Sequence, residues 1–134
     1  MSRENVEIVK RGLAAFNQRD LHAFMEMATP DIELFPAFAG AVDGRAVRGR
    51  EGIEMLFREI RDTWAEQRVI ADEFRTLGDR VVALGRIVGR GKGSGVPVET
   101  PGATIIDFRD GKMARVRTYL GPHGEALRAA GLTV

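Results

Sequence analysis

The feature that most constrains the fold of this chain is a change of hydrophobic period near Arg68. Before it, apolar residues recur at helical spacing, and after it they follow strand-like patterns almost to the end of the chain. The strand-like segments cover residues 68–77, 80–90, 96–109 and 112–120. They are joined by Gly78-Asp79, a glycine-rich stretch and Asp110-Gly111. Such short connections predict an antiparallel meander, because strands joined by tight turns run in opposite directions.

The part before this change contains three helical segments and one further strand. Helices are predicted over about residues 2–17, over 21–27 with Asp20 as the N-cap, and over 53–64. A strand is expected over about 32–38, and a short last helix around 125–130 ends at Gly131. This order indicates a single α+β domain over residues 1–134, with helices packed on one face of a mostly antiparallel sheet.

Two details of the meander carry further predictions. Pro97 and Pro101 predict a bulge or a late start in the third segment, since proline cannot donate to a strand ladder. The second segment is apolar on both faces, so something must cover the face that the helices leave free. We expect a homodimer formed through this sheet face, with Arg115, Arg117 and Tyr119 at its polar rim.

The ionisable residues exclude several classes of protein. There are 20 basic and 19 acidic side chains, a balance that gives no overall field to attract nucleic acid or an anionic membrane. No apolar run approaches the ~20 residues of a membrane span. With no cysteine and two histidines, thiolate chemistry and a metal centre are not expected. We therefore predict a cytoplasmic protein without cofactor, metal, nucleic acid or membrane partner.

Five stretches, in order along nearly the whole chain, carry a family resemblance. They read ENVEIVKRGLAAFNQRDLHAF, PDIELFP, VRGREGIEMLFREI, FRDGKMARVRTYL and EALRAAGL. Together they resemble the SnoaL-like branch of the nuclear transport factor 2-like superfamily, which includes ketosteroid isomerases. The resemblance implies a cone-shaped α+β barrel, in which a curved, mostly antiparallel sheet wraps around three N-terminal helices and leaves an apolar cavity. It also implies that homodimers are common.

The resemblance does not supply a reaction, because this superfamily includes isomerases, cyclases, dehydratases, hydrolases and proteins without catalysis. A ketosteroid-isomerase-like site would have a tyrosine where Gly12 stands and aspartates near Leu34 and Thr104. A SnoaL-type cyclase would have an aspartate about where Thr118 stands. None of these side chains is present. Proton abstraction next to a carbonyl needs a tuned base and an oxyanion donor, and glycine, leucine and threonine cannot act as that base.

The side chains expected to line the cavity share an inward-facing position on a strand or on a helix. We predict that they contact a small hydrophobic or polycyclic ligand, although each also fits a plain hydrophobic core. They are Phe16, Leu34, Phe38, Phe57, Trp64, Thr104, Val116 and Thr118.

Few residues are left that could act as an acid or a base. Glu99 lies between two prolines on a segment that could overhang the cavity mouth, so it is the first candidate for a general base. His123, at the start of the last helix, is the second, because histidine titrates near neutral pH. Glu33 is expected on the outer face of the sheet, in a salt bridge with Arg115 or Arg117.

Two functions fit these observations. The first is a protein that binds a hydrophobic ligand, with turnover as a cofactor-free isomerase, cyclase or hydrolase left open. The second is a non-catalytic dimeric interaction module with a closed cavity and a sheet face that recruits a partner. An open cavity with at least two converging titratable groups would favour an enzyme, whereas a filled cavity without them would argue against one.

Overall fold

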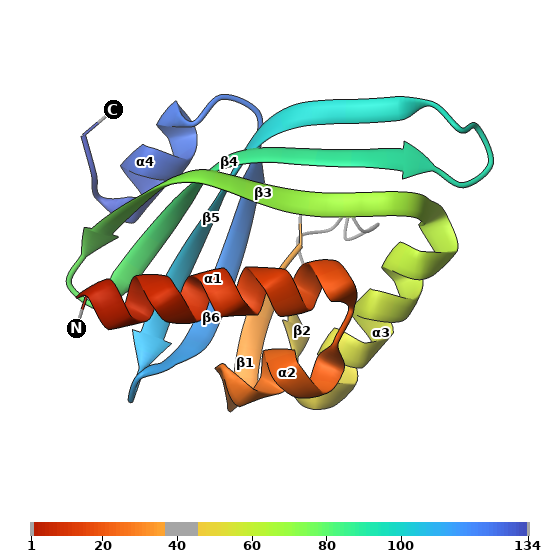
Figure 1. Ribbon diagram of the computed structural model, residues 1–134. Coiled ribbons are helices and arrows are strands. Elements are labelled where there is room, and N and C mark those ends of the chain that lie inside the picture. Colours follow the sequence, from red (N-terminus) through yellow and green to blue (C-terminus); the bar gives the residue numbers. More distant parts are fainter. Residues whose placement is uncertain (1, 37–45, 134) are drawn as a thin grey trace.

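The computed structural model describes residues 2–36 and 46–133, and in it the helices pack against one six-stranded sheet (Figure 1). The helices are α1 (Ser2–Gln18), α2 (Leu21–Glu26), α3 (Gly49–Thr63) and α4 (Gly124–Ala130). The strands are β1 (Ala28–Phe35), β2 (Val47–Arg48), β3 (Trp64–Leu77), β4 (Arg80–Gly91), β5 (Pro97–Arg109) and β6 (Lys112–Leu120).

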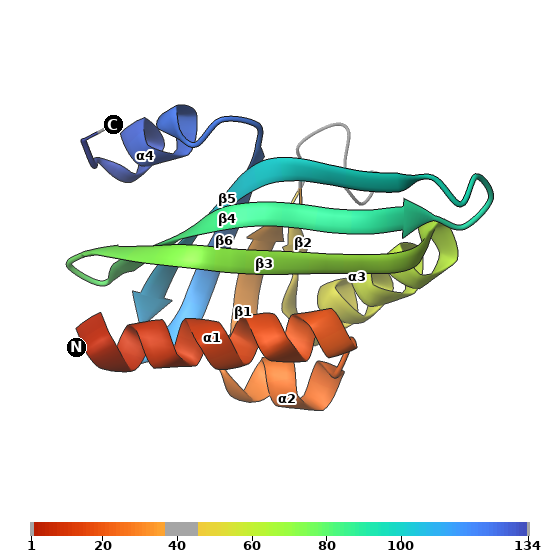
Figure 2. The same cartoon turned by 45° about the horizontal axis from the view of Figure 1, so that its top comes forward.

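The sheet has the order β2-β1-β6-β5-β4-β3 and is curved and open (Figure 2). All neighbouring strands are antiparallel except β1 and β6, which run parallel. Helices α1, α2 and α3 lie on the concave side, whereas α4 lies on the opposite side (Figure 2). The α+β class, the mostly antiparallel sheet and the meander are therefore confirmed.

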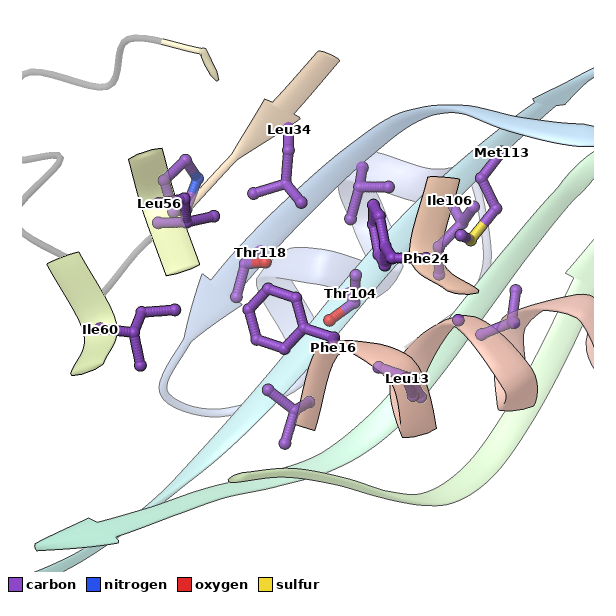
Figure 3. A pocket seen from close by; sticks show the side chains of 15 residues that line it. Leu13, Phe16, Phe24, Leu34, Leu56, Ile60, Thr104, Ile106, Met113 and Thr118 are labelled. Carbon is purple, nitrogen blue, oxygen red and sulfur yellow. The ribbon is translucent and has the colours of Figure 1, made fainter. Parts of the chain in front are cut away.

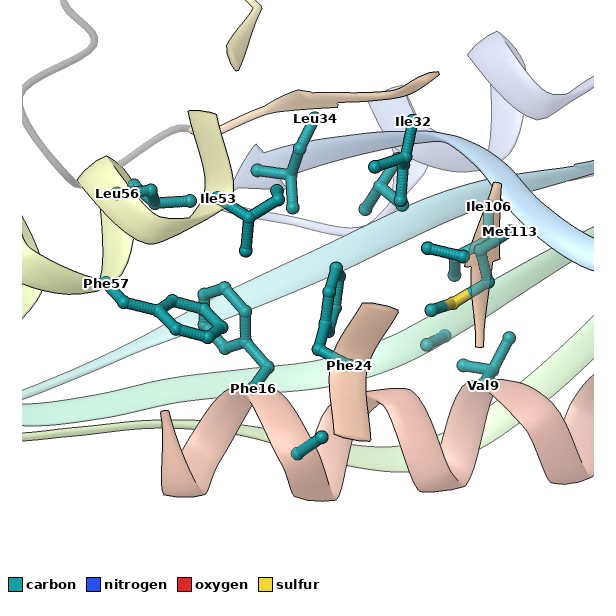
Figure 4. Close-up of a cluster of buried hydrophobic side chains, with 14 of the residues drawn as sticks. Val9, Phe16, Phe24, Ile32, Leu34, Ile53, Leu56, Phe57, Ile106 and Met113 are labelled. Atoms are coloured by element: carbon teal, nitrogen blue, oxygen red, sulfur yellow. The ribbon is translucent and has the colours of Figure 1, made fainter. Parts of the chain in front are cut away.

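Three phenylalanines tie the N-terminal helices together beneath the concave face (Figure 4). The ring of Phe16 on α1 lies 6.3 Å from that of Phe24 on α2 and 5.5 Å from that of Phe57 on α3, centroid to centroid. Phe24 and Phe57 meet edge to face at 6.1 Å. Aromatic pairs prefer such tilted contacts, because the ring edge is positive and the ring face negative. This cluster fixes the three helices relative to one another and to the sheet.

The end of α1 is joined to the edge strand β3 by one side chain. The carboxamide of Asn17 donates from Nδ2 to the carbonyl oxygen of Val69 at 3.0 Å, and its Oδ1 accepts from the Val69 N–H at 2.9 Å. The side chain thus takes the place of a neighbouring strand at this position. It satisfies backbone groups that an edge strand otherwise leaves unpaired.

Part of the second apolar face of the meander is covered by α4 of the same chain. Val82 and Leu84 of β4 and Ile105 of β5 pack against α4, whose Leu127 is buried on them together with Ala126 and Ala130. For the part beneath α4, a homodimer is therefore not needed as the cover of this face. The last helix shields it because its small residues allow a close approach to the strands.

Local signals at several element ends are confirmed. Asp20 caps α2 by accepting from the N–H of Ala23 at 3.1 Å, and Gly131 ends α4 in a left-handed conformation with φ of 85°. The predicted turn at residues 110–111 has positive φ at both positions. These features depend only on neighbouring residues, which is why the sequence signals them.

Other predicted boundaries were wrong. Strand β1 begins at Ala28 instead of about residue 32, and Trp64 begins β3 instead of ending α3. Strand β5 pairs with β4 without interruption through Pro97 and Pro101, so the predicted bulge is absent there. The sheet tolerates the two prolines because their backbone nitrogens, which carry no hydrogen, point away from β4 and toward the side where β6 has already ended. On that side, the Pro101 carbonyl oxygen accepts a hydrogen bond from the Gly121 N–H at 2.8 Å.

Candidate functional site

A cavity of about 40 Å³ lies between the three N-terminal helices and the concave face of the sheet (Figure 3). Nearly all of its lining side chains are aliphatic or aromatic. It is lined by Val9, Gly12, Leu13, Phe16, Phe24, Leu34, Pro36, Leu56, Ile60, Val69, Thr104, Ile106, Met113, Val116 and Thr118. At roughly 10–15 Å³ for each water molecule, the space holds about three of them. A larger ligand therefore requires lining side chains to move.

The helical and strand periods bring these side chains to one place. On α1, Val9, Leu13 and Phe16 are spaced by four and three residues and so share one helical face, and Leu56 and Ile60 do the same on α3. On the strands, alternate residues face the cavity, as Thr104 and Ile106 do on β5 and Val116 and Thr118 do on β6.

Two threonines provide the only polar side chains among the described residues that line the cavity. Thr104 on β5 and Thr118 on β6 are register partners in an antiparallel pair, and both point into the cavity (Figure 3). Side chains at such positions have Cβ atoms about 5 Å apart. Their hydroxyl groups can therefore bind the same ligand atom, each as a donor or an acceptor.

Five of the eight predicted cavity residues meet around this space, namely Phe16, Leu34, Thr104, Val116 and Thr118. Phe57 does not line it, because its ring packs against the other two phenylalanines and is 1% exposed. Trp64 does not line it either, since α3 ends one residue earlier and the indole lies over Gly89. The predicted residue Phe38 lies outside the described part of the chain.

Several lining residues are not among those predicted from the sequence. Leu56 faces the cavity in place of Phe57, one step further round the same helix, and Met113 enters it from the start of β6. Gly12 leaves room for the Met113 side chain because it has no Cβ atom, and a Cβ atom there would lie 2.7 Å from the terminal methyl group of Met113. The i, i+4 spacing of Leu56 and Ile60 could have predicted that both residues face the cavity, whereas no local sequence pattern predicts this for Met113.

Neither predicted acid/base candidate reaches the cavity. Glu99 falls on the outer face of the sheet, because β5 stays regular and its side chains keep alternating. Its side chain is 63% exposed, and its carboxylate lies 3.6 Å from the Arg86 guanidinium. His123 sits beside α4, where its Nε2 lies 2.9 Å from the carbonyl oxygen of Gly85. It ties the last helix to the sheet.

Two further carboxylates near the sheet, those of Glu33 and Asp31, are in ion pairs. Glu33 lies on the outer face as predicted but pairs with Arg48 at 2.8 Å, because β2 brings that residue alongside β1. Arg109 donates to Asp31, and this hydrogen bond holds the pKa of the Asp31 carboxyl below its ordinary value. These residues belong to the outer surface and not to the cavity.

The four positions at which the family resemblance places catalytic side chains all line the cavity. They hold Gly12, Leu34, Thr104 and Thr118. The space therefore lies where such a centre would be, but its described lining contains no side chain that titrates between acid and neutral pH. Within residues 2–36 and 46–133, no group of three histidines or carboxylates is placed to hold a metal ion. None of the helices in the same two ranges has the length and apolar character of a membrane span.

Comparisons with known proteins agree with this geometry. The model of the SnoaL-like domain matches residues 9–116. No match was found among curated proteins. Among solved structures, an NTF2-like protein of unknown function from Burkholderia pseudomallei K96243 has a TM-score of 0.78 at 22% identity, over 93% of this chain and 95% of that one.

Two further similar structures contain small molecules. TerC, co-crystallised with polyporic acid, has a TM-score of 0.77 at 24% identity, over 95% of this chain and 97% of TerC. A protein with a ketosteroid isomerase-like fold from Catenulispora acidiphila DSM 44928, in complex with trimethylamine, has a TM-score of 0.74 at 22% identity, over 95% of this chain and 94% of that one. At these identities, the likenesses show a shared fold.

Proposed function

Since the chain belongs to the SnoaL-like domain family, we propose that it binds a small, mainly apolar ligand with one hydrogen-bonding group in the cavity of its concave face. The observation that carries this proposal is the lining itself, an apolar surface interrupted by the hydroxyl groups of Thr104 and Thr118. Small-molecule sites commonly combine an apolar wall with a few placed polar groups. The complexes of TerC with polyporic acid and of the Catenulispora protein with trimethylamine support a ligand of this general kind.

The two hydroxyl groups suit binding and orientation. A threonine hydroxyl donates one hydrogen bond and accepts others, so the pair fits a carbonyl or hydroxyl oxygen of the ligand. It does not fit proton abstraction by the route that the resemblance suggests, because a general base would have to stand at Leu34 or Thr118. If the protein is an isomerase, a cyclase or a hydrolase, its reaction uses groups other than the side chains at these four positions.

The second candidate function is a non-catalytic interaction module. The small volume of the cavity favours it, because about 40 Å³ admits a few water molecules and no organic ligand unless the wall opens. The two proposals differ in what fills the space. A ligand-binding protein opens the wall for its ligand, whereas an interaction module keeps it closed and acts through its surface.

The test compares ligand binding in the full chain with binding in a variant whose cavity is filled. Native mass spectrometry with phenol, 2-naphthol and naphthalene finds binders, and calorimetry gives their affinity. We expect at least one of these compounds to bind and Gly12→Leu to weaken it at least tenfold, since any side chain there enters the space beside Met113. Leucine also favours the helix over glycine by up to about 1 kcal/mol, so folding should survive.

A second variant isolates the hydroxyl group. Thr118→Val keeps the shape of the side chain and removes its hydrogen bond to the ligand. It should therefore weaken the binding of 2-naphthol by roughly fivefold to tenfold, which corresponds to about 1 kcal/mol. Naphthalene, which has no hydroxyl group, serves as the matched control and should bind equally to both proteins. No binding by any of the three compounds, or equal binding to Gly12→Leu, would favour the interaction module.

A further inference from the structure

A polar groove of about 510 Å³ adjoins the cavity, where α1 and α3 end beside the first residues of β3 (Figure 1). Asn17 and Arg19 line it from the end of α1, Arg61 from α3, and Trp64 and Gln67 from β3. We call it the arginine groove. Ile60 lines both the cavity and the groove, so the two spaces lie on either side of one apolar side chain.

Two buried N–H groups of the arginine groove have no acceptor. The indole Nε1 of Trp64 and the amide Nε2 of Gln67 make no hydrogen bond within the described chain, and Gln67 is only 5% exposed. Native proteins pair nearly all of their buried donors, because an unpaired donor loses its bond to water without a replacement. Both groups can donate and neither can accept at these atoms. Both nitrogen atoms are closed to water in this conformation, so an acceptor bound in the groove reaches them when the two side chains turn outward.

Arg19 is held at the groove without help from a ligand. Its Nη1 donates to the carbonyl oxygen of Phe16, and its Nη2 donates to the carbonyl oxygen of Gln67 at 2.9 Å and to Oε1 of the same residue at 2.6 Å. The guanidinium also lies 5.2 Å from the ring centroid of Phe16. A guanidinium has five N–H donors, so two remain for a ligand. A group fixed in advance loses little freedom on binding.

Cations outnumber carboxylates among the residues that line the groove, which include Arg19, Arg61, Arg68 and Glu66. Burial, and then the nearby charge of Arg61, lower the pKa of the Arg19 guanidinium, and neither residue is in an ion pair within the described ranges. Lys92 adds a third cation, since its ammonium group donates to the backbone carbonyl of Arg61 at 3.2 Å. The carboxylate of Glu66 also borders the groove, but strand alternation sends it to the face opposite Gln67, beside its register partner Arg90.

We propose that the arginine groove binds an oxyanion, a carboxylate or a phosphate, whose oxygens accept from Arg19, Arg61, the Trp64 indole and the Gln67 amide. Arginine suits this role because its planar donors match the oxygens of such groups. The proposal goes beyond ligand binding in the cavity and holds whether or not the cavity is filled. The anion has two sources: the charged head of a ligand whose apolar part occupies the cavity, or a small free anion.

The single tryptophan provides the readout. The indole N–H of Trp64 gives one resonance in the nitrogen–proton spectrum of the labelled full chain, which is titrated with sodium acetate, benzoate or phosphate against sodium chloride at equal ionic strength. We expect a saturable downfield shift with at least one oxyanion. Arg61→Gln should weaken it about tenfold, the effect of one charge-assisted hydrogen bond. Arg58→Gln is the matched control, because this exposed arginine of α3 contacts only Glu54 among the described ion pairs.

The source of the anion follows from the cavity variant. Benzoate binding that is lost in Gly12→Leu identifies the head of a cavity ligand, whereas acetate or phosphate binding that survives in this variant identifies a free anion. Either result supports the proposal that the arginine groove binds an oxyanion.

The proposal is wrong if no oxyanion shifts the indole resonance beyond chloride, or if Arg61→Gln and Arg58→Gln bind equally. Should Arg61→Gln fail to fold, Trp64→Phe removes the donor but keeps a ring, and calorimetry must then show weaker binding.

Discussion

Asn17→Ala tests the contact that joins α1, which carries much of the cavity wall, to the edge strand β3. The substitution removes two hydrogen bonds to Val69, of 3.0 and 2.9 Å, and leaves a half-buried N–H and C=O without their partners. At about 1 kcal/mol for each bond the loss is about 2 kcal/mol. Alanine recovers up to about 0.5 kcal/mol through its higher helix propensity. The expected net loss of unfolding free energy is therefore about 1.5 kcal/mol.

This loss can be measured globally and locally. An unfolding entropy of roughly 2.1 cal/mol/K per residue gives about 0.28 kcal/mol/K for 134 residues, so Tm should fall by about 5 °C. Hydrogen exchange of the Val69 amide should accelerate about tenfold or more, since it loses its acceptor, Oδ1 of Asn17. Gln18→Ala, at the exposed neighbouring position, is the control. The reasoning is refuted if the two variants unfold within 0.5 kcal/mol of each other, a margin typical of surface substitutions, or if exchange at Val69 is unchanged.

Three further predictions concern the cavity, the sheet and the surface charges. Leu56→Ala should lower the unfolding free energy by about 3 kcal/mol in a denaturant titration, because this 1% exposed side chain leaves a larger void, and a loss below 1 kcal/mol would show that the wall collapses. Gly85→Ala should lower the unfolding free energy by more than about 3 kcal/mol or prevent folding, because its Cβ would overlap a backbone carbonyl oxygen of β3. Gly93→Ala is the control, because there is open space around Gly93, and it should unfold like the wild type. The Asp31 carboxyl has a lowered pKa, so its pairing with Arg109 stabilises the fold above about pH 3.8, and this stabilisation is lost as the pH falls through the folded-state pKa. Arg109→Met should raise the pKa of Asp31 in an NMR titration. An unchanged pKa would contradict the assignment of the shift to this hydrogen bond.

The sequence determined what depends on neighbours along the chain. The change from helical to strand period predicted the α+β class and the meander, since each period reflects which side chains share a face within a few residues. Asp20 and Gly131 marked helix ends for the same reason, because a cap needs only the adjacent turn. Alternation along single strands also placed Thr104 and Thr118 on the concave side.

Only the tertiary structure decided which of these faces meet. Phe57 and Leu56 are adjacent and equally apolar, yet packing against two other rings takes Phe57 out of the cavity and leaves Leu56 in its wall. Glu33 pairs with Arg48 because the pairing of β2 with β1, and not charge alone, selects its partner. Likewise, part of the sheet face predicted to pair with a second chain is covered by α4, whose place depends on contacts between segments far apart in sequence. Such contacts follow from packing and chain crossing, which no local period encodes.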